Sequence, residues 1–383
     1  MGYIIKSKKM CMENGVIENT PLFVEGGLIK HIGPEAENMT GEAIDLKDYT
    51  LLPGFIDIHV HGGGGYDIMD ATYEAVDAIS KFKIKEGVTS FCPTTVTASL
   101  DSLKAALNSI TEAMDKGVSG ADILGPFIEG PYINAHYKGA HPEDKIRPVN
   151  LDEIKDLVSH AKGNVSIAIA PELKDALKAI KYIADKGITV RIGHTGADYD
   201  CVNSAVRNGA KIAVHTYNAM SPLTHRDPGT VGGVMDNDEL YAELIFDTVH
   251  VHPAAARILA RVKPEGKMVL ITDCMRAGGL TDGEYMLGEL PVIVKDSIAR
   301  TETGNLAGST VSLNKAVNNM LKLGKFDMIK AVNMASLNPA NALGLTDRGL
   351  IALGKRADLI AVDGDFNVKF VMVNGKILIN NIE

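Results

Sequence analysis

P-G-F-I-D-I-H-V-H-G-G-G-G (residues 53–65) is an apolar run that ends in two histidines and four glycines. In a β-strand, side chains two residues apart lie on the same face. We therefore expect Asp57, His59 and His61 to point the same way, which would let the two imidazoles share a metal ion. The alternative, that the histidines are only the polar end of a buried strand, stays open here, because an H-x-H pair often arises by chance.

Further apolar, β-branched segments follow this stretch, with helical patterns such as 73–85 and 102–114 between them. The eight predicted strands are 55–61, 88–93, 122–129, 165–170, 188–194, 211–215, 241–247 and 268–273. Eight β/α repeats fit an α/β fold of the closed (β/α)8 type, a TIM barrel of about 250 residues, better than an open sheet. The dinucleotide-binding alternative lacks the G-x-G-x-x-G motif after the first strand.

The two ends of the chain have a different pattern, with short strands and turns in place of β/α repeats. E-G-G-L-I-K-H-I-G and V-N-G-K-I-L-I are typical of β-hairpins. We predict a small, discontinuous β-sandwich domain formed by residues 1–52 and 350–383, with 357–363 as a central strand, and a catalytic barrel over 53–349. An irregular insert at about 281–311 follows the eighth strand, and a long connection of this kind is often functional.

Composition excludes several classes of function. Lys and Arg number 39 against 48 Asp and Glu, giving a net charge of −9 over 383 residues. No basic segment with interleaved aromatic residues is present, so we expect no nucleic-acid partner. No apolar run reaches the 18 or so residues that cross a bilayer, so we expect no membrane partner and a cytoplasmic location. The four cysteines are scattered, which indicates neither a disulfide framework nor a structural zinc site.

Polar residues end five of the predicted strands, beyond the histidines of the first. They are Glu129, His194, His215, Asp247 and Asp273. Enzymes with a TIM barrel carry their chemistry at the C-terminal ends of the strands, so these side chains are expected to meet. Histidine nitrogen and carboxylate oxygen suit zinc, iron, manganese or cobalt, and the set does not favour a metal that prefers thiolates.

Several longer motifs make a resemblance specific. The chain resembles the amidohydrolase superfamily and, within it, the deacetylases of N-acetylglucosamine 6-phosphate, over essentially its whole length. The motifs are P-G-F-I-D-I-H-V-H-G (53–62), E-G-P (129–131), K-G-A-H (138–141), G-H-T (193–195), H-T-Y-N-A-M-S-P (215–222), H-R-D-P-G (225–229), D-T-V-H-V-H-P (247–253), T-D-C-M-R-A-G-G (272–279), N-L-A-G-S (305–309) and G-K-R-A-D-L (354–359).

The resemblance implies a role for each matching residue. Glu129, His194 and His215 would hold a primary divalent ion, and His59 with His61 a second one, so that each subunit binds one or two ions. Asp273 would be the catalytic aspartate and would also lie at the metal. The implied substrate-binding residues are Ala140, His141, Asn218, Ala219, Arg226, His250, Leu306, Ala307 and Gly308. Family members are typically homodimers, in which Arg226 would reach the phosphate across the interface.

The implied reaction is hydrolysis of the N-acetyl amide of N-acetyl-D-glucosamine 6-phosphate to D-glucosamine 6-phosphate and acetate. A bound metal supplies hydroxide near neutral pH, and Asp273 acts as general base and then as general acid. Two alternatives stay open. One is a related amidohydrolase acting on another N-acetyl amino sugar, such as N-acetylgalactosamine 6-phosphate, or on a non-phosphorylated N-acyl compound. The other is a barrel scaffold without catalytic activity.

Overall fold

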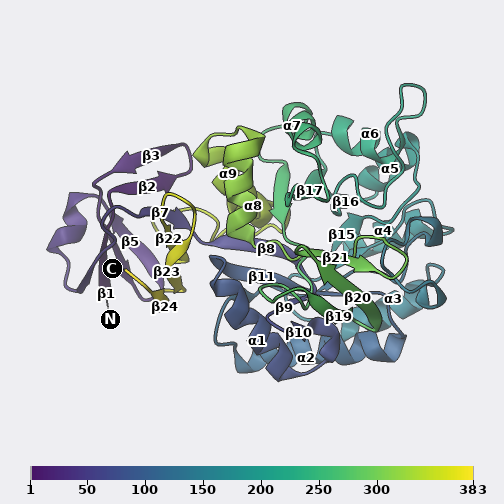
Figure 1. Ribbon diagram of the computed structural model, residues 1–383, viewed down its shortest axis with the longest axis horizontal. Helices are drawn as coiled ribbons and strands as arrows, with labels where there is room; N and C mark the ends of the chain where they lie inside the picture. Colours follow the sequence, from purple (N-terminus) through teal and green to yellow (C-terminus); the bar gives the residue numbers. More distant parts are fainter. Residues whose placement is uncertain (1, 383) are drawn as a thin grey trace.

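Parallel strands in eight successive positions form a barrel in the computed structural model, which describes residues 2–382 (Figure 1). In order they are β8 (Phe55–Val60), β11 (Val88–Thr95), β13 (Phe127–Ile128), β14 (Ser166–Ala168), β15 (Thr189–Ile192), β16 (Ala210–Ala213), β17 (Tyr241–Ile245) and β18 (Met268–Ile271). The first and last strands meet where His61 N donates to Cys274 O and Asp273 N donates to His59 O. The predicted TIM barrel is confirmed.

The third predicted strand differs from its prediction, because it is broken. Residues 122–129 form two short pieces, β12 (Asp122–Ile123) and β13, which both pair with β11. Gly125 lies between them with φ of 145°, and a Cβ atom there would lie 2.5 Å from Asn164 N. Only glycine accepts this conformation and this close approach, so the interruption is built into the sequence.

Helices cover the outside of the barrel (Figure 1). They are α1 (Tyr73–Ile84), α2 (Leu100–Lys116), α3 (Leu151–Ser159), α4 (Ala176–Asp185), α5 (Tyr199–Arg207), α6 (Gly229–Asp236), α7 (Pro253–Val262), α8 (Leu313–Asn319), α9 (Met328–Ala335) and α10 (Leu337–Ala342). Thr72 and Ser99 cap the first two helices by accepting backbone N–H groups, as is typical of these residues at N-caps. The helical patterns at 73–85 and 102–114 are thereby confirmed.

Two further sheets from both ends of the chain form a β-sandwich beside the barrel (Figure 1). One contains β5 (Leu28–Ile32), β4 (Leu22–Glu25), β1 (Gly2–Lys6) and β6 (Glu42–Asp45); the other contains β24 (Lys376–Asn380), β23 (Val368–Val373), β22 (Leu359–Val362), β7 (Thr50–Pro53), β2 (Lys9–Met12) and β3 (Gly15–Glu18). Leu22 from one sheet and Phe370 from the other are buried in a shared apolar core. Both predicted hairpins form, and β22 is central; the domain boundaries at 52/53 and 349/350 stay a prediction.

The insert after β18 is more regular than predicted. It forms an antiparallel sheet of β19 (Gly283–Leu287), β20 (Leu290–Lys295) and β21 (Ile298–Thr301). Alternate residues Val292 and Val294 are buried with Leu287, while Ile293 between them is 47% exposed. The period-2 pattern in P-V-I-V-K thus indicates a strand with one buried face. The prediction of an irregular insert did not use this pattern. The sheet places Leu287 beside the mouth of the barrel.

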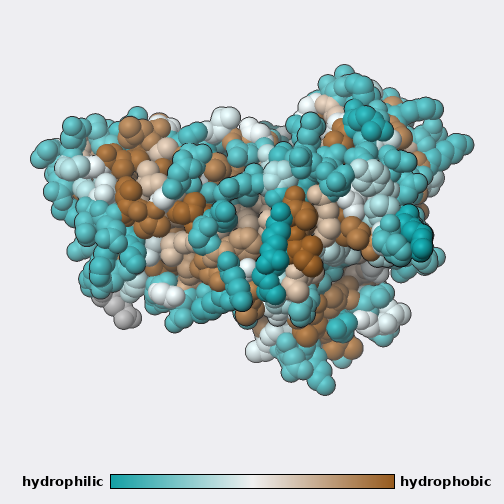
Figure 2. Space-filling view, turned by 90° about the horizontal axis from the view of Figure 1, so that it is seen from above, coloured by the Kyte–Doolittle hydropathy of each residue, from teal (hydrophilic) through white to brown (hydrophobic). Residues whose placement is uncertain are grey.

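The molecular surface is mixed in polarity. Figure 2 shows hydrophilic side chains over much of one face, with hydrophobic side chains in smaller groups among them. Among residues 2–382, no helix combines the length and the apolar content that crossing a membrane requires.

Candidate metal centre and active site

Three of the predicted site residues have left-handed backbone conformation two positions after the ends of their strands. His194, His215 and Asp273 have φ of 48°, 27° and 50°. For residues other than glycine this region costs on the order of 1–3 kcal/mol and persists only where the surroundings hold it. Here the N–H of Asp273 donates to His59 O, and the N–H of His215 donates to the Glu243 carboxylate. These turns direct the three side chains into the mouth of the barrel.

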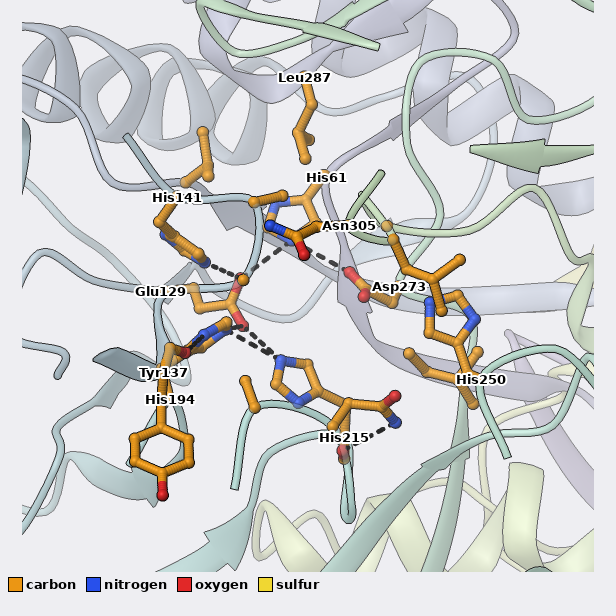
Figure 3. A pocket seen from close by; sticks show the side chains of 18 of the residues that line it. His61, Glu129, Tyr137, His141, His194, His215, His250, Asp273, Leu287 and Asn305 are labelled. Carbon is orange, nitrogen blue, oxygen red and sulfur yellow. Dashed lines mark hydrogen bonds and ion pairs between the residues drawn. The ribbon is translucent and has the colours of Figure 1, made fainter. Parts of the chain in front are cut away.

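Glu129 lies at the centre of a histidine cluster at this mouth (Figure 3). Its Oε1 atom is 3.3 Å from Nε2 of both His194 and His215. Its Oε2 atom is 3.0 Å from Nε2 of His61. The Nε2 atoms of His194 and His215 are themselves 3.1 Å apart. One carboxylate therefore contacts imidazoles that come from three different strand ends.

His59 and His61 form the other side of the cluster together with Asp273. Their Nε2 atoms are 3.3 Å apart. Oδ1 of Asp273 lies 3.3 Å from Nε2 of His59 and 3.2 Å from Nε2 of His61. Nε2 of His59 is also 3.5 Å from Oε1 of Glu129. Glu129 thus lies between two groups of nitrogen and oxygen atoms.

Asp57 does not take part in this cluster, although its spacing suggested the same face as the histidines. Its carboxylate lies 3.0 Å from Lys83 Nζ and accepts the Thr272 hydroxyl at 2.6 Å. It also accepts the backbone N–H of Thr272. Asp57 therefore links β8 to the end of β18 and stabilises the strand ends, outside the histidine cluster.

The cluster fits a divalent cation. Oε1 of Glu129 is buried and accepts no hydrogen bond, although three imidazole nitrogens lie 3.3–3.5 Å from it. Ligand atoms that surround one ion at bond lengths of about 2.0–2.2 Å lie roughly 3 to 3.5 Å apart, as these atoms do. The atoms are nitrogen and carboxylate oxygen, the donors that zinc, iron, manganese and cobalt accept. The buried triads His59–His61–Glu129 and Glu129–His141–His194 each have the spacing of a metal site.

The hydrogen bonds of the Nδ1 atoms show that His194 and His141 have different tautomers. Nδ1 of His194 lies 2.9 Å from the carbonyl oxygen of Tyr137, which only accepts, so Nδ1 carries the proton and Nε2 has a free lone pair. Nδ1 of His141 instead accepts the backbone N–H of Thr97 at 3.3 Å and lies 2.7 Å from the Thr97 hydroxyl, which is able to donate to it. The backbone N–H can only donate, so the proton of a neutral ring is on Nε2. His194 therefore suits a metal ligand, whereas His141 suits a hydrogen-bond donor, even though its spacing would permit ligation.

Burial and the mutual charges set the ionisation of the cluster. Burial lowers the pKa of His141 to about 4, so this ring is neutral at pH 7. Burial alone would lower the pKa of His61 too, but the hydrogen bonds to Asp273 and Glu129 raise it to about 9. Burial likewise opposes ionisation of Asp273, yet His59 and His61 hold its pKa at about 2. Asp273 is therefore ionised and able to accept a proton.

A cavity of about 290 Å³ opens directly above the cluster. Twelve of the fifteen predicted site residues line it: His61, Glu129, Ala140, His141, His194, His215, Asn218, Ala219, His250, Asp273, Leu306 and Gly308. His59 lies beneath the lining and is fully buried, and Ala307 is buried in the small apolar cluster under the β19–β21 sheet. Arg226 is exposed on the loop before α6 and does not line the cavity.

The amidohydrolase family model matches residues 50–378, most of the chain. The chain belongs to the amidohydrolase family. Among the curated relatives of this amidohydrolase, N-acetylglucosamine-6-phosphate deacetylase of Vibrio furnissii is 40% identical over 92% of the chain and 89% of the relative. N-acetylgalactosamine-6-phosphate deacetylase of Escherichia coli O157:H7 is 37% identical over 98% and 99%. The crystal structure of N-acetylglucosamine-6-phosphate deacetylase from Pasteurella multocida is similar at a TM-score of 0.94 and 30% identity, covering 99% and 100%.

Other residues of this amidohydrolase reach the site without having been predicted. Tyr137 and Leu287 line the cavity, and no local pattern marks them. Asn305 also lines it and begins the N-L-A-G-S motif, although no role was predicted for it. Glu243 and Arg191 lie beneath the histidines, fully buried. Here a signal was present, because each is a single charged residue within an apolar strand, T-V-R-I and Y-A-E-L-I. A charge in such a run requires a partner inside the barrel.

Proposed function

We propose that this amidohydrolase hydrolyses the N-acetyl amide of N-acetyl-D-glucosamine 6-phosphate to D-glucosamine 6-phosphate and acetate. The observation that carries the proposal is the convergence of Glu129, the histidines and ionised Asp273 at the floor of one cavity. The names of relatives that match nearly the whole chain support the substrate. A non-catalytic scaffold would not be expected to keep every one of these groups.

Glu129, His194 and His215 would hold the primary metal ion, and His59 with His61 and Asp273 a second one. We propose zinc, iron, manganese or cobalt for these sites, because each accepts nitrogen and carboxylate ligands. When bound, such an ion makes a water molecule acidic enough to attack at neutral pH and polarises the amide carbonyl. Side chains of the cavity carry out the proton transfers and bind the substrate.

Asp273 acts as general base and then as general acid. It accepts the proton of the attacking water as the water oxygen bonds to the carbonyl carbon, and it then gives that proton to the amide nitrogen as the C–N bond breaks. The amine leaves only when protonated, so one carboxylate serves both steps. His141 lines the cavity, and its Nε2 atom lies 3.6 Å from Oε2 of Glu129. We propose that its Nε2–H group donates to the carbonyl oxygen as negative charge develops there.

The upper part of the cavity would hold the sugar. Ala140, Leu306 and Gly308 offer apolar and backbone surface, Asn218 and Ala219 offer backbone groups, and His250 offers an imidazole. Asp247 fixes that imidazole, because its carboxylate lies 2.6 Å from His250 Nδ1. Nε2 of His250 is thereby left for the substrate.

Phosphate recognition would involve Arg226 of a second subunit. The side chain is exposed and outside the cavity of its own chain, and Leu223 in the same loop is 51% exposed. An arginine and an apolar side chain presented together on a loop are suited to a contact between two copies of the chain. We therefore propose a homodimer in which each Arg226 serves the other active site. We also propose a cytoplasmic location, which the four free cysteines support.

Arg226→Ala is expected to raise KM for N-acetylglucosamine 6-phosphate about 10- to 100-fold, because a hydrogen bond to a charged group contributes about 1.5–3 kcal/mol. Steady-state kinetics should show little change in kcat, and little change with non-phosphorylated N-acetylglucosamine. Arg207→Ala, which removes an exposed arginine on α5, is the matched control. Equal losses on both sugars would contradict a role in phosphate binding. Mixing Arg226→Ala with an inactive Asp273→Asn subunit should recover activity only if Arg226 acts across a dimer.

His59→Gln combined with His61→Asn is expected to lower the metal content by one ion per subunit and to leave the first ion bound. The reason is that Glu129, His194 and His215 keep their mutual contacts in the variant. Elemental analysis of purified, reconstituted protein measures the stoichiometry. His31→Asn with His160→Gln, two histidines outside the cavity, is the control. Loss of all metal would show that the pair belongs to the primary site.

Acetate release from N-acetylglucosamine 6-phosphate by the metal-loaded protein tests the function itself. N-acetylgalactosamine 6-phosphate must be assayed beside it, because a relative with 37% identity bears that name. A higher kcat/KM for the galactosamine compound would favour the alternative substrate. No release from either sugar with zinc, iron, manganese or cobalt would reject the proposal.

A further inference from the structure

A buried arginine and a buried glutamate lie directly beneath the histidine cluster. Arg191 on β15 and Glu243 on β17 both have 0% exposure. Nη1 of Arg191 donates to Oε1 of Glu243 at 2.6 Å and to the backbone oxygen of Ile58 at 2.9 Å. Its guanidinium carbon lies 3.9 Å from the centroid of the Phe127 ring. The pair therefore joins β15 and β17 to the strand that carries His59.

The two oxygens of Glu243 have different partners. Oε1 faces Arg191, while Oε2 lies 3.2 Å from Nδ1 of His59 and accepts the backbone N–H of His215, also at 3.2 Å. An ionised carboxylate only accepts, so the proton of His59 must be on Nδ1. In the neutral ring that binds a metal ion, Nε2 then has the free lone pair. That atom is the one that faces His61, Glu129 and Asp273.

Arg191 determines how the Glu243 side chain can be replaced. A glutamine at 243 has one accepting oxygen and one donating NH₂ group. With the arginine present, the amide oxygen would face the charged guanidinium, which is the stronger donor. The NH₂ group would then face Nδ1 of His59 and the backbone N–H of His215, which would lose its acceptor. Nδ1 would then have to accept, and the proton of His59 would move to Nε2. That proton would occupy the lone pair needed for a metal ion.

We propose that Glu243, held by Arg191, is a positioning residue that fixes the His59 tautomer and thereby keeps Nε2 of His59 available to the metal centre. The proposal rests on the metal ligands of the proposed function. It adds that a charge pair without contact to substrate determines how tightly the ion at His59 is held. Loss of such a partner behind a ligand typically weakens metal affinity about 10- to 100-fold.

The test is Co²⁺ binding to metal-free protein, measured by competition with a chelator and by the visible absorption of the bound ion. The binding step that disappears in the His59→Gln/His61→Asn variant identifies the ion at His59. We expect Glu243→Gln to weaken that step about 10- to 100-fold. We expect the double variant Arg191→Met/Glu243→Gln to bind Co²⁺ more tightly than Glu243→Gln, because the amide oxygen is then free to face His59. Recovery of Co²⁺ affinity that does not follow the melting temperatures of the two variants would not be expected from a purely structural role.

Asp358→Asn is the control for lost stability. Asp358 is also a buried carboxylate that pairs with an arginine, Arg356, but it lies in the β-sandwich. The Asp358→Asn substitution should lower the melting temperature without changing the Co²⁺ affinity. If Glu243→Gln does not fold, the double variant Arg191→Met/Glu243→Gln is the test, because it leaves no unpaired buried charge. A Co²⁺ affinity of this double variant as low as that of the His59→Gln/His61→Asn variant would overturn the proposal.

Wild-type Co²⁺ affinity and absorption in a folded Glu243→Gln variant would also overturn it, as would a wild-type protein without a step that depends on His59. These outcomes are separate from the proposed function. A wild-type protein that binds Co²⁺ but releases no acetate would reject the deacetylase activity alone. A wild-type protein that deacetylates, with a Glu243→Gln variant that binds Co²⁺ unchanged, would reject the positioning role alone.

Discussion

Asp273→Asn is expected to lower kcat for acetate release by about a thousandfold. General acid–base catalysis contributes about 10²- to 10⁴-fold, and in the proposed mechanism one carboxylate serves both proton transfers. Asparagine has nearly the same shape but accepts no proton. Its side chain would still lie beside His59 and His61, where Oδ1 of Asp273 is 3.3 and 3.2 Å from their Nε2 atoms. Stopped assays for acetate, with circular dichroism to confirm folding, measure the effect.

Metal content must be measured in the same samples. The ion at Glu129, His194 and His215 is expected to remain, because none of these contacts involves Asp273. Asp115→Asn, an exposed aspartate paired with Lys162, is the matched control and should leave kcat unchanged. A kcat within about tenfold of wild type in a fully metallated Asp273→Asn protein would contradict the assigned role.

Glu129→Gln is expected to remove the primary ion and to lower kcat/KM by more than about a thousandfold. Its carboxylate contacts His61, His194 and His215 together. A cation in such a site stabilises the transition state by several kcal/mol, and about 4 kcal/mol corresponds to a thousandfold in rate. Elemental analysis and steady-state kinetics on the same preparation measure both effects.

The size of the loss distinguishes a ligand from a structural glutamate. Asp358→Asn removes a buried carboxylate in the β-sandwich and should retain metal and activity at temperatures where it is folded. Glu129→Gln protein with a full complement of metal would show that the nitrogen ligands suffice. In that case the central position of Glu129 would serve to balance the charge of the histidines instead.

The regular parts of the barrel could be predicted because their signals are local. Alternation and apolar runs located the strands, and the parallel direction placed the residues that follow them at one end. Glu129, His194 and His215 could therefore be assigned to one site although 86 residues separate the first from the last. The inserted sheet was missed because its alternation was short, and the break at Gly125 because a single glycine has several explanations.

The roles of individual atoms could not be predicted in this way. His141 and His194 each follow a glycine closely in the sequence and have the same side chain. Thr97 N–H nevertheless fixes the tautomer of His141, and Tyr137 O fixes the opposite tautomer of His194. Asp57 has the spacing of a ligand but pairs with Lys83. Both outcomes depend on residues distant in sequence, so no spacing rule contains them.

The sequence by itself determined the barrel, the family and the set of side chains at the strand ends, because strand periodicity and strand direction are properties of each segment. Only the tertiary structure decided which nitrogen of each histidine faces the cluster, that Glu243 and Arg191 lie beneath His59, and that Arg226 lies outside the cavity of its own chain. The physical reason is that a proton on an imidazole, or a charge inside a barrel, is fixed by its partner, and the partner comes from another strand.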